Sequence, residues 1–362
     1  MFDVFGSVKI LIKIDTICID NNIFRLHYKA TVILLIICSL LVTCRQYIGD
    51  PIDCIVEEIP PNVMDTYCWI HSTFSVPEHN KGVNGKDIPH RGIGPESSKE
   101  PYQYHKYYQW VCFTLFFQAI LFYLPRYLWK IWEGGKMSVL VQEMNIPILD
   151  NDVKADRIRL LVDYFSVNRF NHQFYTLKFF FCELLNFINV ISQIFFTDFF
   201  LGGQFTTYGS EVLSMTELEP DQRSDPLSRV FPKMTKCTFH KFGPSGTIEK
   251  FDGLCVLPLN IINEKIYVFL WFWFIIVSVI TGMHVIYRIL TIVVPQLRVI
   301  LLRATARLSS AEKIQHLGDF FSLGDWFVLY QLGKNIDPLI YKEFIDKLEK
   351  AINGRTTSSA FA

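Results

Sequence analysis

The chain has 362 residues, half of them hydrophobic, with 35 basic and 35 acidic side chains and a formal net charge of zero. This composition excludes an intrinsically disordered chain, and it lacks the overall basic excess that nucleic-acid binding requires. The apolar residues are concentrated in four long stretches, which predict a membrane protein.

Residues 1–29 precede the first apolar stretch and are interrupted by charges. Asp3, Lys9 and Lys13 leave no long uncharged core for a cleavable signal peptide, so we expect this segment to remain in the mature protein. Its apolar residues recur at helical spacing, and Asp3 in the first turn complements the helix dipole. The predicted helix has one apolar face, formed by Val4, Val8, Leu11 and Ile12.

Four stretches are long enough for a helix to cross about 30 Å of hydrocarbon. They occupy residues 30–48, 107–125, 174–200 and 266–287. The last is the clearest, because its 22 residues include no Asp, Glu, Lys or Arg. The sequence therefore predicts an all-α membrane protein with four transmembrane helices.

The charges of the connecting segments orient these spans. Segments 1–29, 126–173 and 288–362 carry 4, 7 and 10 basic residues against 3, 6 and 7 acidic ones. The other two are 49–106 and 201–265, and with residues 45–48 counted in the first they carry 6 and 7 basic residues against 9 and 8 acidic ones. By the positive-inside rule, both termini and 126–173 are expected to be cytoplasmic, and the other two segments are extracellular loops.

Cysteine placement supports the same orientation, because disulfides persist on the oxidising side of a membrane. Each extracellular loop has two cysteines, Cys54 and Cys68 in the first and Cys237 and Cys255 in the second. Four cysteines allow three pairings, among which the spacing does not choose. The cysteines in the spans and Cys18 are expected to be small buried apolar side chains.

The third span carries a polar face within the membrane. Its polar residues recur every three or four positions and therefore share one helix face. They are Glu183, Asn186, Asn189, Gln193 and Thr197. Such residues either line a pore or bond to neighbouring helices, and hydrogen bonding between helices is the favoured interpretation.

Two further features lie on the predicted cytoplasmic side. Pro125 either ends the second span or kinks a helix that continues inward. The tail has an apolar periodicity around Trp326 that predicts a small helical domain, whereas residues from Asn353 onward are rich in Ser, Thr and Gly and are expected to be disordered.

The second span begins with a specific string, which reads Tyr107, Tyr108, Gln109, Trp110 and Val111. This string resembles the signature of innexins, the invertebrate gap-junction proteins. The two cysteines per outer loop, Pro125, and the stretches 67–70, 236–239 and 324–327 also resemble insect innexins. The similarity covers nearly the whole chain, and it fits either a cellular innexin or a copy carried by an insect virus.

The resemblance implies a four-helix subunit of a ring-shaped, large-pore channel in the plasma membrane. An octameric ring would dock with a ring in the apposed cell and form a gap junction, and other innexins are further candidate partners. Within each subunit the implied disulfides are Cys54–Cys255 and Cys68–Cys237. The resemblance also favours the gating kink at Pro125.

In that family the N-terminal segment folds into the pore. Our hypothesis is therefore that Met1, Phe2 and Asp3 line its narrow part, where a ring of carboxylates would favour cations. The alternative is that Asp3 only caps its helix.

Other functions lack support in the sequence. The usual phosphate-binding, zinc and nucleophile motifs are absent, so no enzyme activity and no cofactor is expected. Within the channel class the alternative is an undocked hemichannel that releases small molecules. Outside it, the alternative is a four-span adhesion or scaffold protein without a pore.

Overall fold

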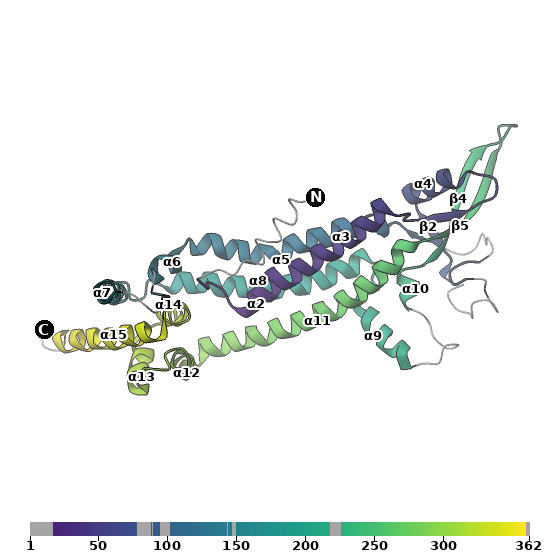
Figure 1. Ribbon diagram of the computed structural model, residues 1–362. Helices are drawn as coiled ribbons and strands as arrows, with labels where there is room; N and C mark the ends of the chain where they lie inside the picture. Colours follow the sequence, from purple (N-terminus) through teal and green to yellow (C-terminus); the bar gives the residue numbers. More distant parts are fainter. Residues whose placement is uncertain are drawn as a thin grey trace. The chain divides into compact units, whose positions relative to one another are not determined.

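A computed structural model describes residues 17–77, 88, 90–94, 102–142, 144–146, 150–217 and 226–359, with side chains as far as 353 (Figure 1). The chain divides into two compact units. Unit 1 comprises residues up to 30, 122–188 and from 279 onward, and unit 2 comprises 31–121 and 189–278. Met1, Phe2 and Asp3 lie outside the described residues.

Four helices of the described chain are long and apolar enough to cross a membrane, as predicted. The first, Asn22–Ile48, consists of α2 (Asn22–Arg25), a π-helical segment η1 (Leu26–Thr31) and α3 (Val32–Ile48). The others are α5 (Val111–Glu133), α8 (Gln173–Phe200) and α11 (Pro258–Val293). The mostly helical membrane fold is therefore confirmed.

These helices differ in length from the apolar stretches that predict them. The first begins eight residues before residue 30, and α11 extends beyond 266–287 at both ends. Residues 107–109 form a short 3₁₀ helix, η3, rather than the start of α5. Backbone hydrogen bonding continues through polar residues that hydropathy excludes, so helix ends and apolar limits need not coincide.

The helix α5 continues through Pro125 to Glu133. The helix therefore continues inward past Pro125, as the interpretation of a kink requires. Proline has no N–H to donate to the carbonyl four residues earlier, so α5 lacks one backbone hydrogen bond at this point.

Unit 2 contains a five-stranded antiparallel sheet that the sequence analysis did not predict. Its order is β1-β5-β4-β2-β3. The strands are β1 (Asp53–Ile55), β2 (Thr73–Ser75), β3 (Gln103–His105), β4 (Met234–Phe242) and β5 (Ile248–Val256). The helices α4 (Pro61–His71), α9 (Phe205–Glu217) and α10 (Pro226–Val230) belong to the same unit. Both predicted outer loops thus contribute to one sheet.

The longest strands, β4 and β5, form a hairpin (Figure 1). A turn between Gly243 and Gly246 connects them, and Gly246 has a φ of 74°, which glycine adopts without steric cost. Buried residues of this unit include Met64, Cys68 and Tyr108, and they pack under the sheet with Leu257.

Unit 1 contains the predicted cytoplasmic helices. They are α6 (Lys136–Val141), α7 (Asn151–Val167), α12 (Pro295–Thr305), α13 (Ala311–Phe320), α14 (Leu323–Gly333) and α15 (Pro338–Ser359). Helix α14 is almost entirely buried, and its Trp326 and Phe327 pack in a core with Trp129 and Phe179. The helix α15 extends to Ser359, so the expectation of disorder from Asn353 is wrong over these residues.

Candidate functional site

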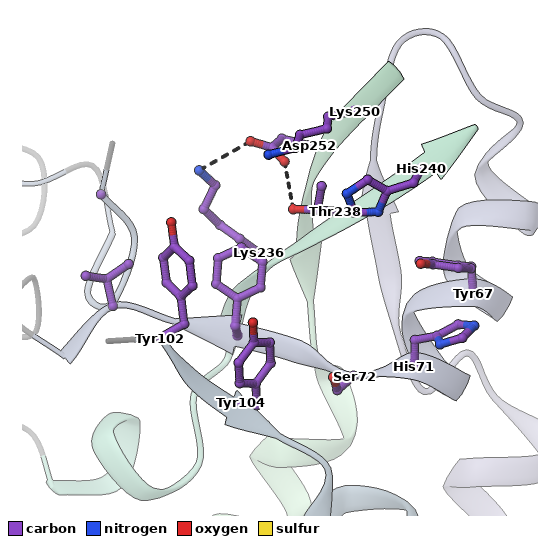
Figure 2. Close-up of a pocket in the computed structure, with 13 residues that line it drawn as sticks. Tyr67, His71, Ser72, Tyr102, Tyr104, Lys236, Thr238, His240, Lys250 and Asp252 are labelled. Atoms are coloured by element: carbon purple, nitrogen blue, oxygen red, sulfur yellow. Dashed lines mark hydrogen bonds and ion pairs between the residues drawn. The ribbon is translucent and has the colours of Figure 1, made fainter. Parts of the chain in front are cut away.

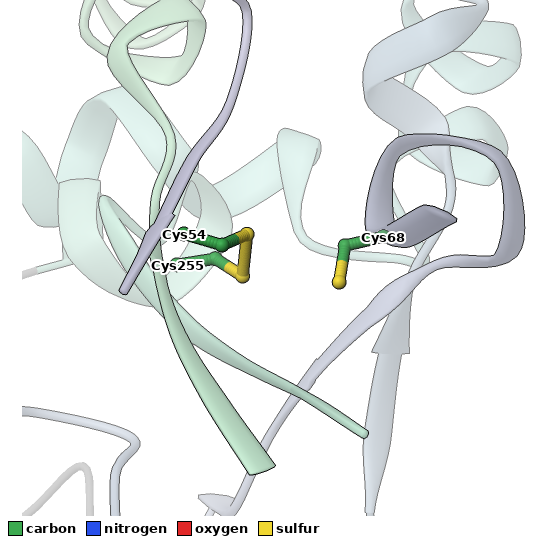
Figure 3. A group of neighbouring side chains, drawn as sticks. All are labelled: Cys54, Cys68 and Cys255. Carbon is green, nitrogen blue, oxygen red and sulfur yellow. A yellow bond between two sulfur atoms is a disulfide. The ribbon is translucent and has the colours of Figure 1, made fainter. Parts of the chain in front are cut away.

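Two disulfides join the predicted outer loops. Cys54 is bonded to Cys255 and Cys68 to Cys237, which are the pairs that the resemblance implies. Cys54 and Cys255 face each other in the register of β1 and β5. The Sγ atom of Cys68 lies within 4.8 Å of both (Figure 3). Three clustered sulfurs resemble a metal site, but zinc requires thiolates, and these sulfurs are oxidised.

The string at 107–111 connects α5 to both outer loops. Tyr107 Oη donates to the carbonyl oxygen of Val230 at 3.2 Å, and Tyr108 Oη donates to that of Cys68 at 3.3 Å. Gln109 donates to the carbonyl oxygen of Trp69. Tyr108 and Val111 are fully buried, whereas Trp110 is exposed. The string therefore positions the loops, beyond the role of an aromatic belt at the membrane interface.

A basic and aromatic hollow of about 390 Å³ lies on the sheet. Figure 2 shows Lys236, Thr238 and His240 of β4 beside Lys250 and Asp252 of β5. The tyrosines 67, 102 and 104 also line it. Asp252 accepts a hydrogen bond from Thr238 at 2.8 Å and lies 3.8 Å from Lys236. Basic groups outnumber this single carboxylate, so the hollow favours anionic groups.

The polar face of α8 lies mostly inside the subunit. Glu183 receives two hydrogen bonds of 2.6 Å from Arg288, and one each from His284 at 2.9 Å and Asn21 at 2.6 Å. Glu183 and Asn186 are at most 4% exposed in the isolated chain. A side chain that lines a pore is exposed in a single subunit, so this burial favours bonding between helices.

The same face continues in unit 2. Gln193 donates to Asn189 at 3.2 Å, and Gln118 of α5 donates to Thr197 at 2.8 Å. Asn189 is partly exposed, whereas Gln193 and Thr197 are buried. The Gln193–Asn189 bond lies within α8, whereas the Gln118–Thr197 bond joins α5 to α8, and polar pairs of this second kind hold transmembrane helices together.

A buried polar cluster in unit 1 joins α14 to the start of α8. His172 Nδ1 lies 2.7 Å from Asp325 Oδ1, and His172 Nε2 lies 2.7 Å from Tyr164 Oη. Ser322 and the Phe170 amide donate to the other carboxylate oxygen. Burial alone would raise the pKa of Asp325, but these hydrogen bonds outweigh it and hold that pKa below its ordinary value.

Gly324 explains why this cluster forms. A Cβ atom there would lie 2.6 Å from the backbone of His172 and Gln173, so only glycine permits this approach. The stretch 324–327 was noted for its resemblance, but nothing in the sequence paired it with His172. For the same reason, nothing in the sequence paired Cys18 with Asn335, or Asn21 with Glu183.

Similarity to known proteins agrees with the four apolar helices and the disulfide-linked loops. The innexin family matches residues 20–352. The chain belongs to the innexin family. It is 63% identical to Innexin inx2 of Schistocerca americana over 98% of this chain and 99% of that protein. It is 64% identical to Innexin inx2 of Drosophila melanogaster over 98% and 97%. It is 45% identical to Innexin shaking-B of Drosophila melanogaster over 96% and 94%.

Innexins are gap junction channel proteins, so the predicted function is confirmed at the level of the family. This innexin is accordingly a membrane protein with four candidate spans, of a family that forms oligomeric gap junction channels.

The sheet contains a histidine that should make the stability of this innexin depend on pH. His105 is 3% exposed, and its Nε2 lies 2.7 Å from Ser75 Oγ. Burial lowers the pKa of His105 to about 4. The unfolded chain, with a histidine pKa of about 6.5, binds this proton more tightly, so stability falls as the pH drops below that value.

The expected loss is about 3 kcal/mol in the free energy of unfolding, complete below pH ~4. Thermal unfolding of the purified protein between pH 7 and pH 4 measures it. The variant His105→Gln, which does not titrate, should show a flatter pH dependence. An unchanged slope in this variant would refute the assignment.

Proposed function

We propose that this innexin is a subunit of an octameric ring in the plasma membrane, with both termini and residues 126–173 in the cytoplasm. The basic residues after the second and fourth spans support this orientation. The two disulfides support it independently, because they join the segments assigned to the oxidising side. The proposal includes no enzymatic step and no cofactor.

Docking with a ring in the apposed cell is proposed to involve the β4–β5 hairpin. Phe242 and Ile248 face each other next to the hairpin turn, and their exposed fractions are 75% and 65%. The neighbouring cross-strand pair is Lys241 and Glu249. An apolar pair flanked by opposite charges suits a contact with a second copy of the same hairpin. This exposed pair is the observation that carries the docking proposal.

The experiment compares dye transfer between paired cells with dye uptake by single cells. The wild-type protein should transfer dye, whereas Phe242→Ser with Ile248→Ser should abolish transfer and leave uptake unchanged. Matched serine substitutions at Val63 of α4 and Leu213 of α9, two exposed apolar residues of the same unit outside the hairpin, serve as controls. Uptake without transfer by the wild-type protein would favour an undocked hemichannel. A protein that does neither would favour a scaffold without a pore.

We also propose that Met1, Phe2 and Asp3 line the narrow part of the pore. Eight Asp3 carboxylates in a ring would attract cations. The variant Asp3→Asn should therefore lower the ratio of cation to anion permeability, measured from reversal potentials in asymmetric salt. An unchanged ratio would leave Asp3 with the role of a helix cap.

Pro125 is proposed as a gating kink within α5. The missing backbone hydrogen bond to Leu121 leaves this point of the helix easier to bend. For Glu183, Asn186, Asn189 and Gln193 the proposed role is bonding between helices, which the burial of Glu183, Asn186 and Gln193 supports. Further proposed partners are other innexins, which would join the same ring.

A further inference from the structure

The chain between the N-terminal segment and the first transmembrane helix is held by polar contacts at four successive residues, Cys18, Ile19, Asp20 and Asn21. Each contacts a different set of elements, all within unit 1. We refer to residues 18–21 as the N-terminal anchor. Residues 1–16 continue directly from it.

The first contact joins the anchor to the C-terminal helical domain. The Cys18 amide donates to Asn335 Oδ1 at 2.6 Å, and Asn335 Nδ2 donates to the Cys18 carbonyl oxygen at 2.9 Å. Asn335 thus pairs with both polar groups of one backbone residue. It is 8% exposed, and its Nδ2 also donates to the Gln331 carbonyl oxygen of α14 at 2.9 Å. The hydrogen bond to Gln331 therefore fixes the orientation of the Asn335 amide relative to the end of α14.

The next contacts join the anchor to the transmembrane helices. Trp129 of α5 donates to the Ile19 carbonyl oxygen at 2.8 Å. Asp20 is 3% exposed and bonds to Arg25, Tyr28 and Arg126 at 3.1, 2.9 and 3.4 Å.

Asn21 completes the anchor. Its Oδ1 caps α2 by accepting from the Phe24 amide, and its Nδ2 donates to Glu183 of α8. The helix start is therefore fixed with respect to the transmembrane helices.

The contacts of Ile19, Asp20 and Asn21 involve transmembrane helices. The Cys18 Sγ atom also accepts from Arg25 of α2 at 2.9 Å, whereas the Cys18 amide and carbonyl oxygen bond to Asn335, two residues after the end of α14. Among the four anchor residues, Cys18 is the nearest in the chain to residues 1–3, so its contact is the anchor contact closest to the proposed pore-lining residues. A shift of α14 would move Asn335 and, through its two hydrogen bonds, the Cys18 backbone.

We propose that Asn335 is a positioning residue through which the C-terminal helical domain fixes the pore-lining N-terminal segment and thereby sets the conductance of the open channel. This inference rests on the proposed pore position of residues 1–3. It predicts that loss of the Asn335 side chain changes the pore but not the assembly of the ring.

The test uses full-length Asn335→Ala, Asn335→Asp and the control Asn353→Ala. Asn353 lies on α15 and bonds within its own helix to Glu349, so its truncation removes an asparagine from the same domain without touching the anchor. The Asp variant keeps an oxygen for the Cys18 amide but loses the donor to the Cys18 carbonyl oxygen. It should therefore have an intermediate effect, and it serves if Asn335→Ala fails to fold.

Three properties are measured on purified rings and on paired cells, namely hydrogen exchange, the pore and ring size. Hydrogen exchange of the Cys18 amide should be roughly fivefold faster in Asn335→Ala, as expected for the loss of one hydrogen bond. Single-channel conductance should change, and so should the rate at which a thiol reagent modifies Asp3→Cys introduced in the same chain. Ring size, measured by light scattering, should be unchanged. Asn353→Ala should match the wild-type protein in all three.

Faster exchange with unchanged conductance and unchanged thiol modification would overturn the proposal, as would unchanged exchange. The pore position of residues 1–3 has a separate readout. If the reagent does not alter the current through channels with Asp3→Cys alone, the pore-lining proposal fails, and a changed exchange rate in Asn335→Ala would still show the anchor contact.

Discussion

Replacing Cys68 and Cys237 together with serine is expected to lower the free energy of unfolding by about 2–5 kcal/mol and to abolish coupling between paired cells. The bond closes a chain segment with a sequence separation of 169 residues, and both cysteines are buried with Met64 and Tyr108. Loss of this bond frees α4 from β4, which is one strand of the β4–β5 hairpin that we propose to dock. Thermal unfolding and dye transfer measure the two effects.

The single variant Cys237→Ser should be worse than the double variant. It leaves a Cys68 thiol within 4.8 Å of the Cys54–Cys255 bond. A Cys68 thiolate that attacks this bond forms a new disulfide and releases the other sulfur as a thiolate, with no external oxidant. Non-reducing peptide mapping should find Cys68 bonded to Cys54 or Cys255. The exposed free thiol of Cys44 supplies a control, since Cys44→Ser should have no effect. Wild-type stability in the double variant would contradict the structural role of the bond.

The variant Glu183→Gln is expected to lower the free energy of unfolding by about 3–5 kcal/mol, because it leaves the buried Arg288 without its counter-charge. Arg288 is 8% exposed, and its guanidinium lies 4.7 Å from the ring centroid of Phe180. The amount of protein delivered to the cell surface and the temperature of thermal unfolding should both fall. Channels that reach the membrane should keep their single-channel conductance.

Two further variants separate the buried charge from the loss of a side chain. Glu183→Gln combined with Arg288→Met removes both charges and should recover part of the stability. Asp346→Asn breaks the partly exposed pair with Lys313 and should cost far less stability than Glu183→Gln, because exposed ion pairs are screened by water. A changed conductance in Glu183→Gln with normal surface delivery would instead assign Glu183 to the pore.

The four membrane helices could be predicted because their apolar stretches are long and local. Their limits could not, because α11 continues through Glu264 and Arg288, where ion pairs compensate the charges. Hydropathy counts a charge as a break, but a helix tolerates it where a partner lies within the protein.

The sheet was missed because three of its strands have only three residues each, too few for an alternating pattern. The hairpin did carry a signal. Residues 243–246 read Gly, Pro, Ser and Gly, which is typical of a turn between strands. This turn lies between two nine-residue strands and could have indicated a hairpin.

The polar clusters of unit 1 are beyond sequence reasoning for another reason. Asn335 and Cys18 are 317 residues apart, and Asp325 and His172 are 153 apart. Periodicity identifies which face of a helix is buried but does not identify its partner. By contrast, the resemblance implied the pairs Cys54–Cys255 and Cys68–Cys237, which spacing alone left open.

The order of the sheet has a consequence for biosynthesis. Its central strands β4 and β5 come late in the chain, whereas β1, β2 and β3 are synthesised more than a hundred residues earlier. The early strands therefore have no central partner until residue 256 has left the ribosome. Cys54 and Cys68 must stay unpaired, or be protected by a chaperone or an isomerase, while two further helices are inserted. Nascent chains cut off before β4 would expose these strand edges and thiols to quality control.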